Sequence, residues 1–168
     1  MIEFNRKQVK AIIKFLSQQH CQIRPALQTI RIRRDGYAYI TDGYMAIKFK
    51  LECEPVPSNA DQEEFIISLE NLDRWYRLAN TKDKLNELTI LELHDENNTT
   101  VYPDISKVFH SHLGNKISKD EFKIDANIIT EFVNITGYNK NQISMHDECI
   151  AIEPLGNNKI LGIIMELK

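Results

Sequence analysis

The sequence predicts an α+β protein in which antiparallel β-sheets pack against amphipathic helices. Apolar residues recur at helical spacing in residues 6–19, in residues 69–80 and after Asp125, while short alternating segments between turn residues fill most of the remainder. The order of strand, helix and three strands also occurs twice, at residues 65–102 and 122–167. We therefore expect one full domain followed by a partial repeat.

The first predicted element is a helix over residues 6–19, with Asn5 as its N-cap. Its apolar stripe consists of Val9, Ile12, Ile13 and Leu16. A different face carries Lys7, Lys10 and Lys14. Two interpretations of these lysines are open, because the outer face of an amphipathic helix is often rich in lysine and a helix directed at phosphates has the same pattern.

Three antiparallel strands are expected next, at residues 27–33, 37–40 and 45–50. Asp35-Gly36 and Asp42-Gly43 are the turn signals between them.

A polar, proline-containing loop at residues 54–64 precedes a short strand at 65–67 and a helix over 69–80 that Ser68 caps. Strands at 88–93 and 99–102 follow, with a turn at Asn97-Asn98 between them.

The second part of the chain is expected to begin with a strand at residues 122–124. Asp125 caps the following helix, which ends at Gly137. Three strands complete the repeat, at residues 142–145, 149–152 and 160–167. The domain division that follows is a domain over residues 1–109, a linker over 110–120 and a partial domain over 121–168.

Composition indicates a compact cytoplasmic protein. The 168 residues are 42% apolar and 27% charged, which is typical of a globular chain. Three unclustered cysteines argue against a disulfide framework and fit a reducing compartment. No apolar run approaches the roughly 20 residues that span a bilayer. The net charge of −3 argues against a generally basic nucleic-acid binder.

No enzymatic constellation is present in the sequence. It contains no P-loop, no dinucleotide fingerprint and no nucleophile elbow. His110 and His112, and likewise His146 and Cys149, have spacings that match no closed zinc site. Asp42 lies in an Asp-Gly turn, where aspartate is common for structural reasons. We therefore predict a binding protein without a metal, a cofactor or an enzymatic activity.

Three stretches together resemble one family. They are Ile40-Thr-Asp-Gly-Tyr-Met-Ala-Ile47, Tyr102-Pro-Asp-Ile-Ser-Lys-Val108 and Ile163-Ile-Met165. Their order and placement resemble the bacterial DNA sliding clamp, the beta subunit of DNA polymerase III, which forms a ring of clamp-type domains around DNA. The chain resembles the middle domain of that clamp joined to the second half of its C-terminal domain. The resemblance therefore implies a DNA-clamp-like fold.

The resemblance implies a hydrophobic pocket that receives short peptide motifs of DNA polymerase, clamp-loader or repair proteins. The residues that match this pocket are Leu27, Thr41, Gly43, Tyr44, Pro103, Val108, Ile163 and Met165. Two positions depart from the family pattern: Ala46 stands where leucine is usual, and Glu166 stands where proline is usual. A smaller side chain at position 46 implies a larger or shallower pocket.

Double-stranded DNA is a further partner that the resemblance implies. The candidate DNA-contacting residues are Lys7, Lys10, Lys14, Arg74 and Arg77. Two roles are open. One is a replication accessory protein that associates with DNA as a homo-oligomer, and the other is a phage or mobile-element protein that captures clamp partners without encircling DNA.

Overall fold

The computed structural model describes residues 3–33, 36–51, 64–95, 98, 100–105, 107, 109, 124–146 and 149–165. Its centre is a seven-stranded sheet with the order β5-β2-β3-β4-β9-β8-β7, in which all neighbouring strands are antiparallel. The strand bounds are β2 (Thr29–Arg33), β3 (Tyr37–Thr41), β4 (Met45–Lys50), β5 (Glu64–Ser68), β7 (Asn141–Met145), β8 (Cys149–Pro154) and β9 (Ile160–Met165). The pairing of β4 with β9 joins the front and the back of the chain in one sheet.

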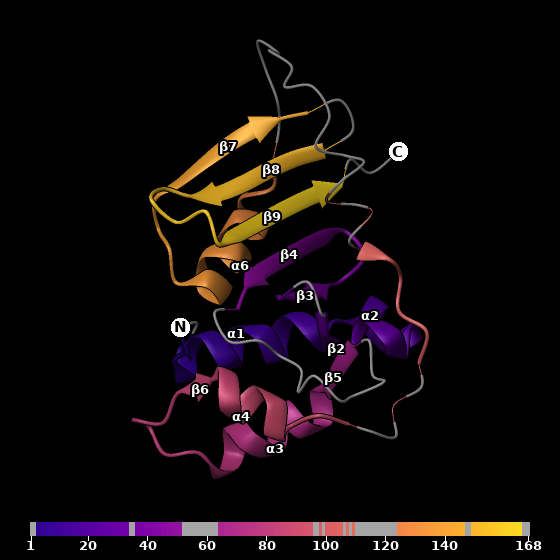
Figure 1. Ribbon diagram of the computed structural model, residues 1–168. Coiled ribbons are helices and arrows are strands. Elements are labelled where there is room, and N and C mark those ends of the chain that lie inside the picture. Colours follow the sequence, from indigo (N-terminus) through magenta and orange to yellow (C-terminus); the bar gives the residue numbers. More distant parts are fainter. Residues whose placement is uncertain are drawn as a thin grey trace.

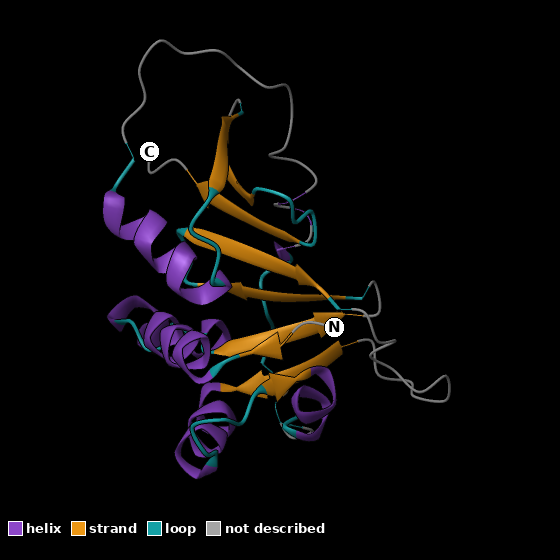
Figure 2. Ribbon diagram, turned by 90° about the vertical axis from the view of Figure 1, so that its left-hand side faces the viewer, coloured by secondary structure: helices purple, strands orange, loops and turns teal. Residues whose placement is uncertain are grey.

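The helices lie mainly along one face of this sheet (Figure 1, Figure 2). Helix α1 (Arg6–Leu16) packs against both α3 (Leu69–Leu78) and α6 (Ala126–Thr136). Shorter elements complete the described chain: α2 (Gln19–Ile23), the 3-10 turn η1 (Pro25–Leu27), α4 (Glu87–Glu92) and a two-stranded sheet of β1 (Glu3–Phe4) with β6 (Leu85–Asn86).

The main core lies between the helices and the sheet. Val9, Ile12 and Leu16 of the predicted α1 stripe are fully buried in it, and Ile13 packs at its border. Asn5 caps α1 as expected, and Gln8 returns a side-chain bond to the Asn5 backbone. This reciprocal arrangement satisfies amide groups that the first turn of a helix leaves without partners.

The opposite face of the sheet carries a second apolar cluster, which we call the outer cluster. Its buried members are Tyr39, Ala46, Ile105, Phe109, Cys149, Ala151, Leu161 and Ile163. Ile105 and Phe109 come from the segment after α4 rather than from the sheet, so this segment covers part of the outer face.

The sequence predicts most elements correctly, with shifts at their ends. Helix α1 ends at Leu16, and residues 19–23 form the separate helix α2. Leu27 lies in η1 and not in the strand, which begins at Thr29, because Pro25 begins a 3-10 turn. The two later helices keep their predicted caps, Ser68 and Asp125.

Two predicted strands are wrong. Residues 87–92 form helix α4, because the Asn86 side chain accepts hydrogen bonds from the Thr89 amide and hydroxyl and so caps a helical turn. Residues 100–102 are irregular, and the carbonyl of Thr100 is bonded to the Arg31 side chain instead of a neighbouring strand. A short apolar segment such as residues 88–93 fits the helical and the strand period about equally well.

The predicted repeat consequently falls in a different place. Among the described residues of 64–102, strand β5 and helix α3 are followed by the short strand β6 and by helix α4. The full order of strand, helix and three strands is found in residues 3–50, and residues 126–165 match it from the helix onward.

Several predictions concern residues outside the described ranges. They include Asp35, most of the 54–64 loop, Asn97, Thr99, the 110–120 linker, residues 122–123 and the Asp147-Glu148 turn. Among the described helices, none combines the length and apolar character needed to cross a membrane.

Candidate functional site

The turn between β3 and β4 is built by its own side chains. The Thr41 hydroxyl donates to the Met45 carbonyl at 2.8 Å and accepts from the Gly43 amide at 3.0 Å. One oxygen of Asp42 accepts from the amides of Tyr44 and Met45, at 2.8 and 2.7 Å. Asp42 is buried, so its carboxylate holds the turn and does not face a substrate.

Gly43 gives the turn a left-handed backbone conformation beside Leu27. Its φ of 95° lies in the left-handed region that favours glycine, and Leu27 Cδ1 lies 3.6 Å from the place that a Cβ would take. Leu27 is buried, whereas the neighbouring Tyr44 is 43% exposed. The predicted pocket residues Leu27, Thr41, Gly43 and Tyr44 therefore come together around one turn.

Ile163 reaches the same region across the sheet. In the strand register, Thr41 pairs with Ala46 and Ala46 pairs with Ile163, so these three residues form one row on the outer face. Ala46 is the smallest of the three. Since neighbouring strands lie about 4.8 Å apart, Thr41 and Ile163 stand about 10 Å apart on either side of it.

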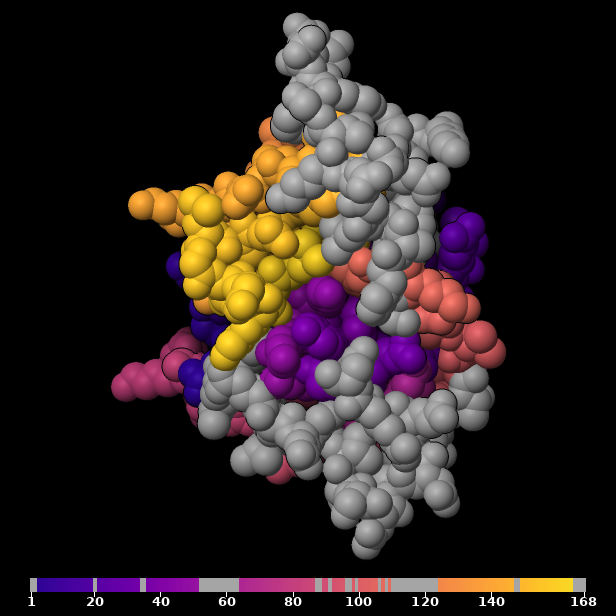
Figure 3. Space-filling view, turned by 45° about the horizontal axis from the view of Figure 1, so that its top comes forward, coloured from indigo at the N-terminus to yellow at the C-terminus, as the bar shows by residue number. Residues whose placement is uncertain are grey.

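The segment around Pro103 closes the other side of this row. The half-buried Tyr102 lies against the Thr41 backbone, and burial of its hydroxyl raises the pKa of that group, with Arg31 opposing and Cys21 and Glu64 adding to the rise. Pro103 itself is exposed at the border of a small cavity of about 180 Å³. Figure 3 shows the stretches around β4, β9 and this segment adjoining on one face, in purple, yellow and salmon.

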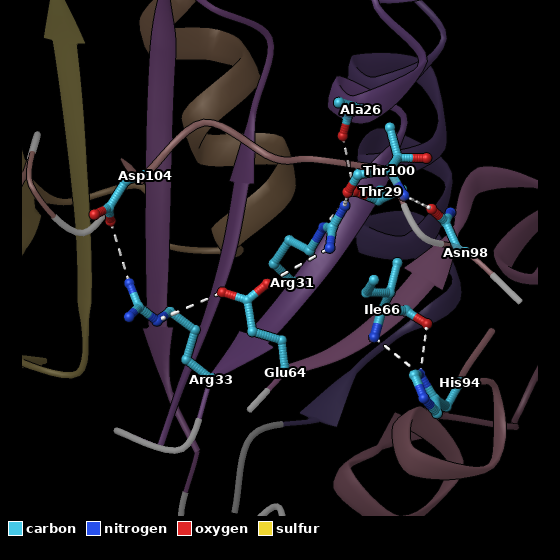
Figure 4. Close-up of polar contacts among 10 residues, drawn as sticks. All are labelled: Ala26, Thr29, Arg31, Arg33, Glu64, Ile66, His94, Asn98, Thr100 and Asp104. Carbon is cyan, nitrogen blue, oxygen red and sulfur yellow. Dashed lines mark hydrogen bonds and ion pairs between the residues drawn. The ribbon is translucent and has the colours of Figure 1, made fainter. Parts of the chain in front are cut away.

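Arg31 fixes the segment in place (Figure 4). Its guanidinium donates to the Thr100 carbonyl at 2.6 Å and to the Thr29 hydroxyl at 3.2 Å, lies 3.5 Å from Glu64, and sits 4.8 Å over the Tyr102 ring. Burial lowers the pKa of Arg31, and the Glu64 carboxylate opposes that shift. Arg31 carries no signal of this role in the sequence, because a charged residue in an alternating strand usually faces solvent.

Two predicted pocket residues are described less fully. Val108 lies outside the described residues. Met165 ends β9, and its backbone pairs with Cys149, one pair beyond the outer row.

The predicted DNA-contacting residues fall into two groups. Lys7, Lys10 and Lys14 are exposed on α1, and their side chains form no ion pair within the described ranges. Helix α1 has no acidic residue, and its Arg6 lies over the Tyr76 ring and donates to the Ala79 carbonyl. On α3, by contrast, Arg74 pairs with Glu70 at 3.2 Å and Arg77 with Asp73 at 2.6 Å. Positive charge is therefore concentrated on α1.

Metal ligation finds no support among the described side chains, which contain no cluster of three or more potential ligands. His146 is buried and lies 3.1 Å from the Ser144 hydroxyl. His110 and His112 lie outside the described residues.

Comparison with solved structures assigns the class of fold. The chain has the fold of bacterial DNA sliding clamps: it aligns with DNA polymerase III subunit beta from Borrelia burgdorferi at a TM-score of 0.57 and 13% identity, over 99% of this chain and 64% of that one. The clamp of Pseudomonas aeruginosa gives a TM-score of 0.56 at 12% identity, over 99% and 66% of the two chains. The Helicobacter pylori clamp bound to a DNA ligase peptide gives 0.54 at 15% identity, over 99% and 65%.

The likeness is one of fold and not of sequence. No protein-family model matches the chain, and no curated protein matches it either. The chain spans less than two thirds of the length of these clamps.

Proposed function

We propose that this chain is a clamp-like binding protein that holds short peptides with an apolar anchor at the outer row of Thr41, Ala46 and Ile163. The observation that carries the proposal is the convergence of this row with the Gly43 turn and the Tyr102-Pro103 segment at the join between β4 and β9. A solved clamp of the same fold holds a peptide of DNA ligase. Polymerase, clamp-loader and repair proteins are the proposed sources of the peptide here.

The mechanism is binding without chemistry. An aliphatic or aromatic anchor gains about 25 cal/mol for each Å² of apolar surface that it buries, and ordering of the peptide offsets part of this gain. Thr41, Ala46 and Ile163 are themselves buried, and the exposed Tyr44 lies beside them at the border of the row.

The exposed Tyr44 provides a direct test. We expect Tyr44→Ala to weaken binding of a polymerase-type clamp-binding peptide about tenfold, measured by fluorescence anisotropy, because an aromatic contact at the border of the site is lost. Tyr138→Ala is the matched control, since Tyr138 is 38% exposed and belongs to neither the row nor its turn. A peptide that binds the wild type and both variants equally would remove Tyr44 from the site, and a wild type that binds no such peptide would refute the function.

Association with DNA through α1 is the second part of the proposal. Replacement of Lys7, Lys10 and Lys14 by glutamate should abolish DNA binding or reduce its dependence on salt, because each phosphate contact contributes about 0.9 to the slope of log K against log salt. The same change at Arg74 and Arg77 should have a smaller effect, since both are already paired with carboxylates. Equal effects of the two sets, measured by titration at several salt concentrations, would refute a special role for α1.

A second candidate function is that of a phage or mobile-element protein that captures clamp partners without encircling DNA. Peptide binding that persists without any DNA association would favour it.

A further inference from the structure

Another cavity, which we call the end cavity, lies at the far end of β4 from the outer row. Strand β4 begins beside the Gly43 turn and ends at Lys50, whose amide donates to the Lys159 carbonyl at 2.7 Å. The end cavity has a volume of about 650 Å³ and lies among β1, the start of α1, the end of α6 and the turn between β8 and β9. Figure 1 shows these parts together on the left-hand side of the view. The end cavity is therefore separate from the candidate peptide site.

Hydrogen bonds between distant segments hold the walls of the end cavity. The Gln8 side chain of α1 donates to two carbonyls at the end of α6, at 3.2 and 2.9 Å. The Asn157 side chain donates to the Tyr138 hydroxyl at 2.6 Å and accepts from the Lys159 amide at 2.9 Å. All four of these side chains line the cavity. The cavity is therefore built into the fold at the join between the front and the back of the chain.

The lining is mainly polar and has hydrogen-bonding groups that the protein does not use. The side-chain oxygen of Asn5 accepts two amides of α1, whereas its NH2 group has no partner among the described residues. The exposed Asn158 also lines the cavity, and its side chain makes no hydrogen bond within the described ranges. Amide side chains match the donor and acceptor edges of nucleobases. The end cavity can therefore recognise a polar ring.

Tyr138 adds an aromatic surface to the end cavity. Its side chain is exposed, and the bond from Asn157 to its hydroxyl limits the movement of the ring. The buried Phe4 and Ile160 contribute apolar atoms to the same lining. Aromatic side chains bind nucleobases by stacking, whatever the base, because every base has a flat π-face. A planar ligand therefore has a surface to lie on.

The charge at the end cavity favours an anion. Lys159 lines the cavity, while Glu3, the only carboxylate among the described lining residues, is paired with Lys84 at 2.5 Å. The exposed Lys7 follows Asn5 by two residues and begins the lysine face of α1. The end cavity thus lies where the lysine face of α1 begins.

We propose that the end cavity binds a nucleotide, with its base stacked on Tyr138 and its phosphate near Lys159. The polar edge of the base lies at the amides of Asn5 and Asn158. The volume falls within the range of about 300–1,000 Å³ that is typical of ligand pockets. An apolar peptide anchor suits this cavity poorly, because its burial would leave the amide side chains without partners. The nucleotide is either free or the unpaired end of a DNA strand, and only the second source rests on the proposed DNA association of α1.

Titration with nucleoside 5′-monophosphates tests the proposal. We expect the wild-type protein to bind at least one of the adenosine, guanosine, cytidine and thymidine monophosphates in isothermal titration calorimetry. Chemical-shift changes in the NMR spectrum should centre on the amides of Gly137 and Gly156, which line the cavity. Tyr138→Ala should weaken the binding about tenfold, because base stacking is lost. Binding that Tyr138→Ala leaves unchanged would overturn the assignment.

Three further variants separate the site from general effects. Tyr138→Phe keeps the ring and should bind more tightly than Tyr138→Ala, and equal weakness of the two would contradict stacking. Asn158→Asp keeps the size of the side chain and should weaken binding by repelling the phosphate; this variant decides if Tyr138→Ala does not fold. Leu155→Ala is the matched control, since Leu155 is exposed in the same turn but does not line the cavity. Equal losses in Leu155→Ala and Tyr138→Ala would refute the site.

Duplex DNA distinguishes the two sources of the nucleotide. A duplex with one unpaired nucleotide at its end is compared with the blunt duplex by fluorescence anisotropy. If the source is a strand end, the unpaired nucleotide should tighten binding, and Tyr138→Ala should remove the difference. If the source is a free nucleotide, the two duplexes should behave alike while a monophosphate binds. The monophosphate titration needs no DNA association, so a failure of DNA binding by α1 leaves it valid. Neither monophosphate binding nor a preference for the unpaired end would refute the proposal.

Discussion

Buried polar side chains organise the candidate site at the level of single residues. Asp42 and Arg31 both lie under the surface, and each is bonded to backbone groups: Asp42 to two amides of its turn, and Arg31 to the Thr100 carbonyl. A buried charge is tolerated when such bonds satisfy it. Both residues therefore shape the site and are not available for catalysis.

Cys21 makes stability depend on pH. Burial, with repulsion from Asp42, raises the pKa of its thiol to about 11 from an ordinary 9.0. The folded chain therefore keeps a proton that the unfolded chain releases, so this contribution is present below pH 9 and is lost as pH rises toward 11. Urea denaturation should show that the free energy of unfolding falls between pH 8 and 11. In Cys21→Ala this fall should be smaller by up to about 2–3 kcal/mol. Parallel pH profiles would contradict this assignment.

Close contacts between elements set the position of the helices on the sheet. A Cβ on Gly162 of β9 would lie 2.5 Å from the Phe132 ring of α6, a distance that requires movement of the ring or the strand. Gln8 of α1 donates to the carbonyls of Ile135 and Thr136, the last residues of α6, at 3.2 and 2.9 Å. Helix α6 is thus held by β9 on one side and by α1 on another.

Gly162→Ala is the variant that tests this packing. We expect a loss of about 1–3 kcal/mol in the free energy of unfolding, because overpacking a filled core forces side chains from their preferred rotamers. The double variant Gly162→Ala with Phe132→Leu should lose less free energy of unfolding than the two single variants lose in sum, since the smaller side chain relieves the contact. Additive losses in urea denaturation would show that the two residues are independent.

At the scale of the whole molecule, one sheet and one helix layer cross the predicted domain boundary. Strand β4 pairs with β9 along five residue pairs, and α1 packs on α6. The main core includes residues from both sides of residues 110–120. Separation of the two parts would expose a sheet edge and apolar surface on each.

The two parts are therefore expected to unfold together. Trp75 fluorescence reports on α3 in the front part, while far-UV circular dichroism reports on the whole chain. Both should give the same urea midpoint and the same slope, because a shared core makes unfolding cooperative. Gln8→Ala should lower both midpoints together by weakening the link between α1 and α6. Two separated transitions would show that the predicted domains fold independently.

Local signals in the sequence account for the elements that were predicted correctly. Asn5, Ser68 and Asp125 cap helices, and Asp42-Gly43 forms a turn, because these side chains bond to backbone groups within a few residues of their own position. The apolar stripe of α1 likewise depends only on helical spacing. The fold class and most strands were accessible from the sequence for this reason, whereas the grouping of Leu27, Thr41, Gly43 and Tyr44 was implied by the family resemblance.

Other features depend on residues that are distant in the chain. Arg31 contacts Thr100 and Tyr102, which lie about 70 residues away in the sequence. The row of Thr41, Ala46 and Ile163 exists because β4 pairs with β9. Only the tertiary structure decided these contacts, because strand pairing joins residues whose separation in sequence carries no local signal.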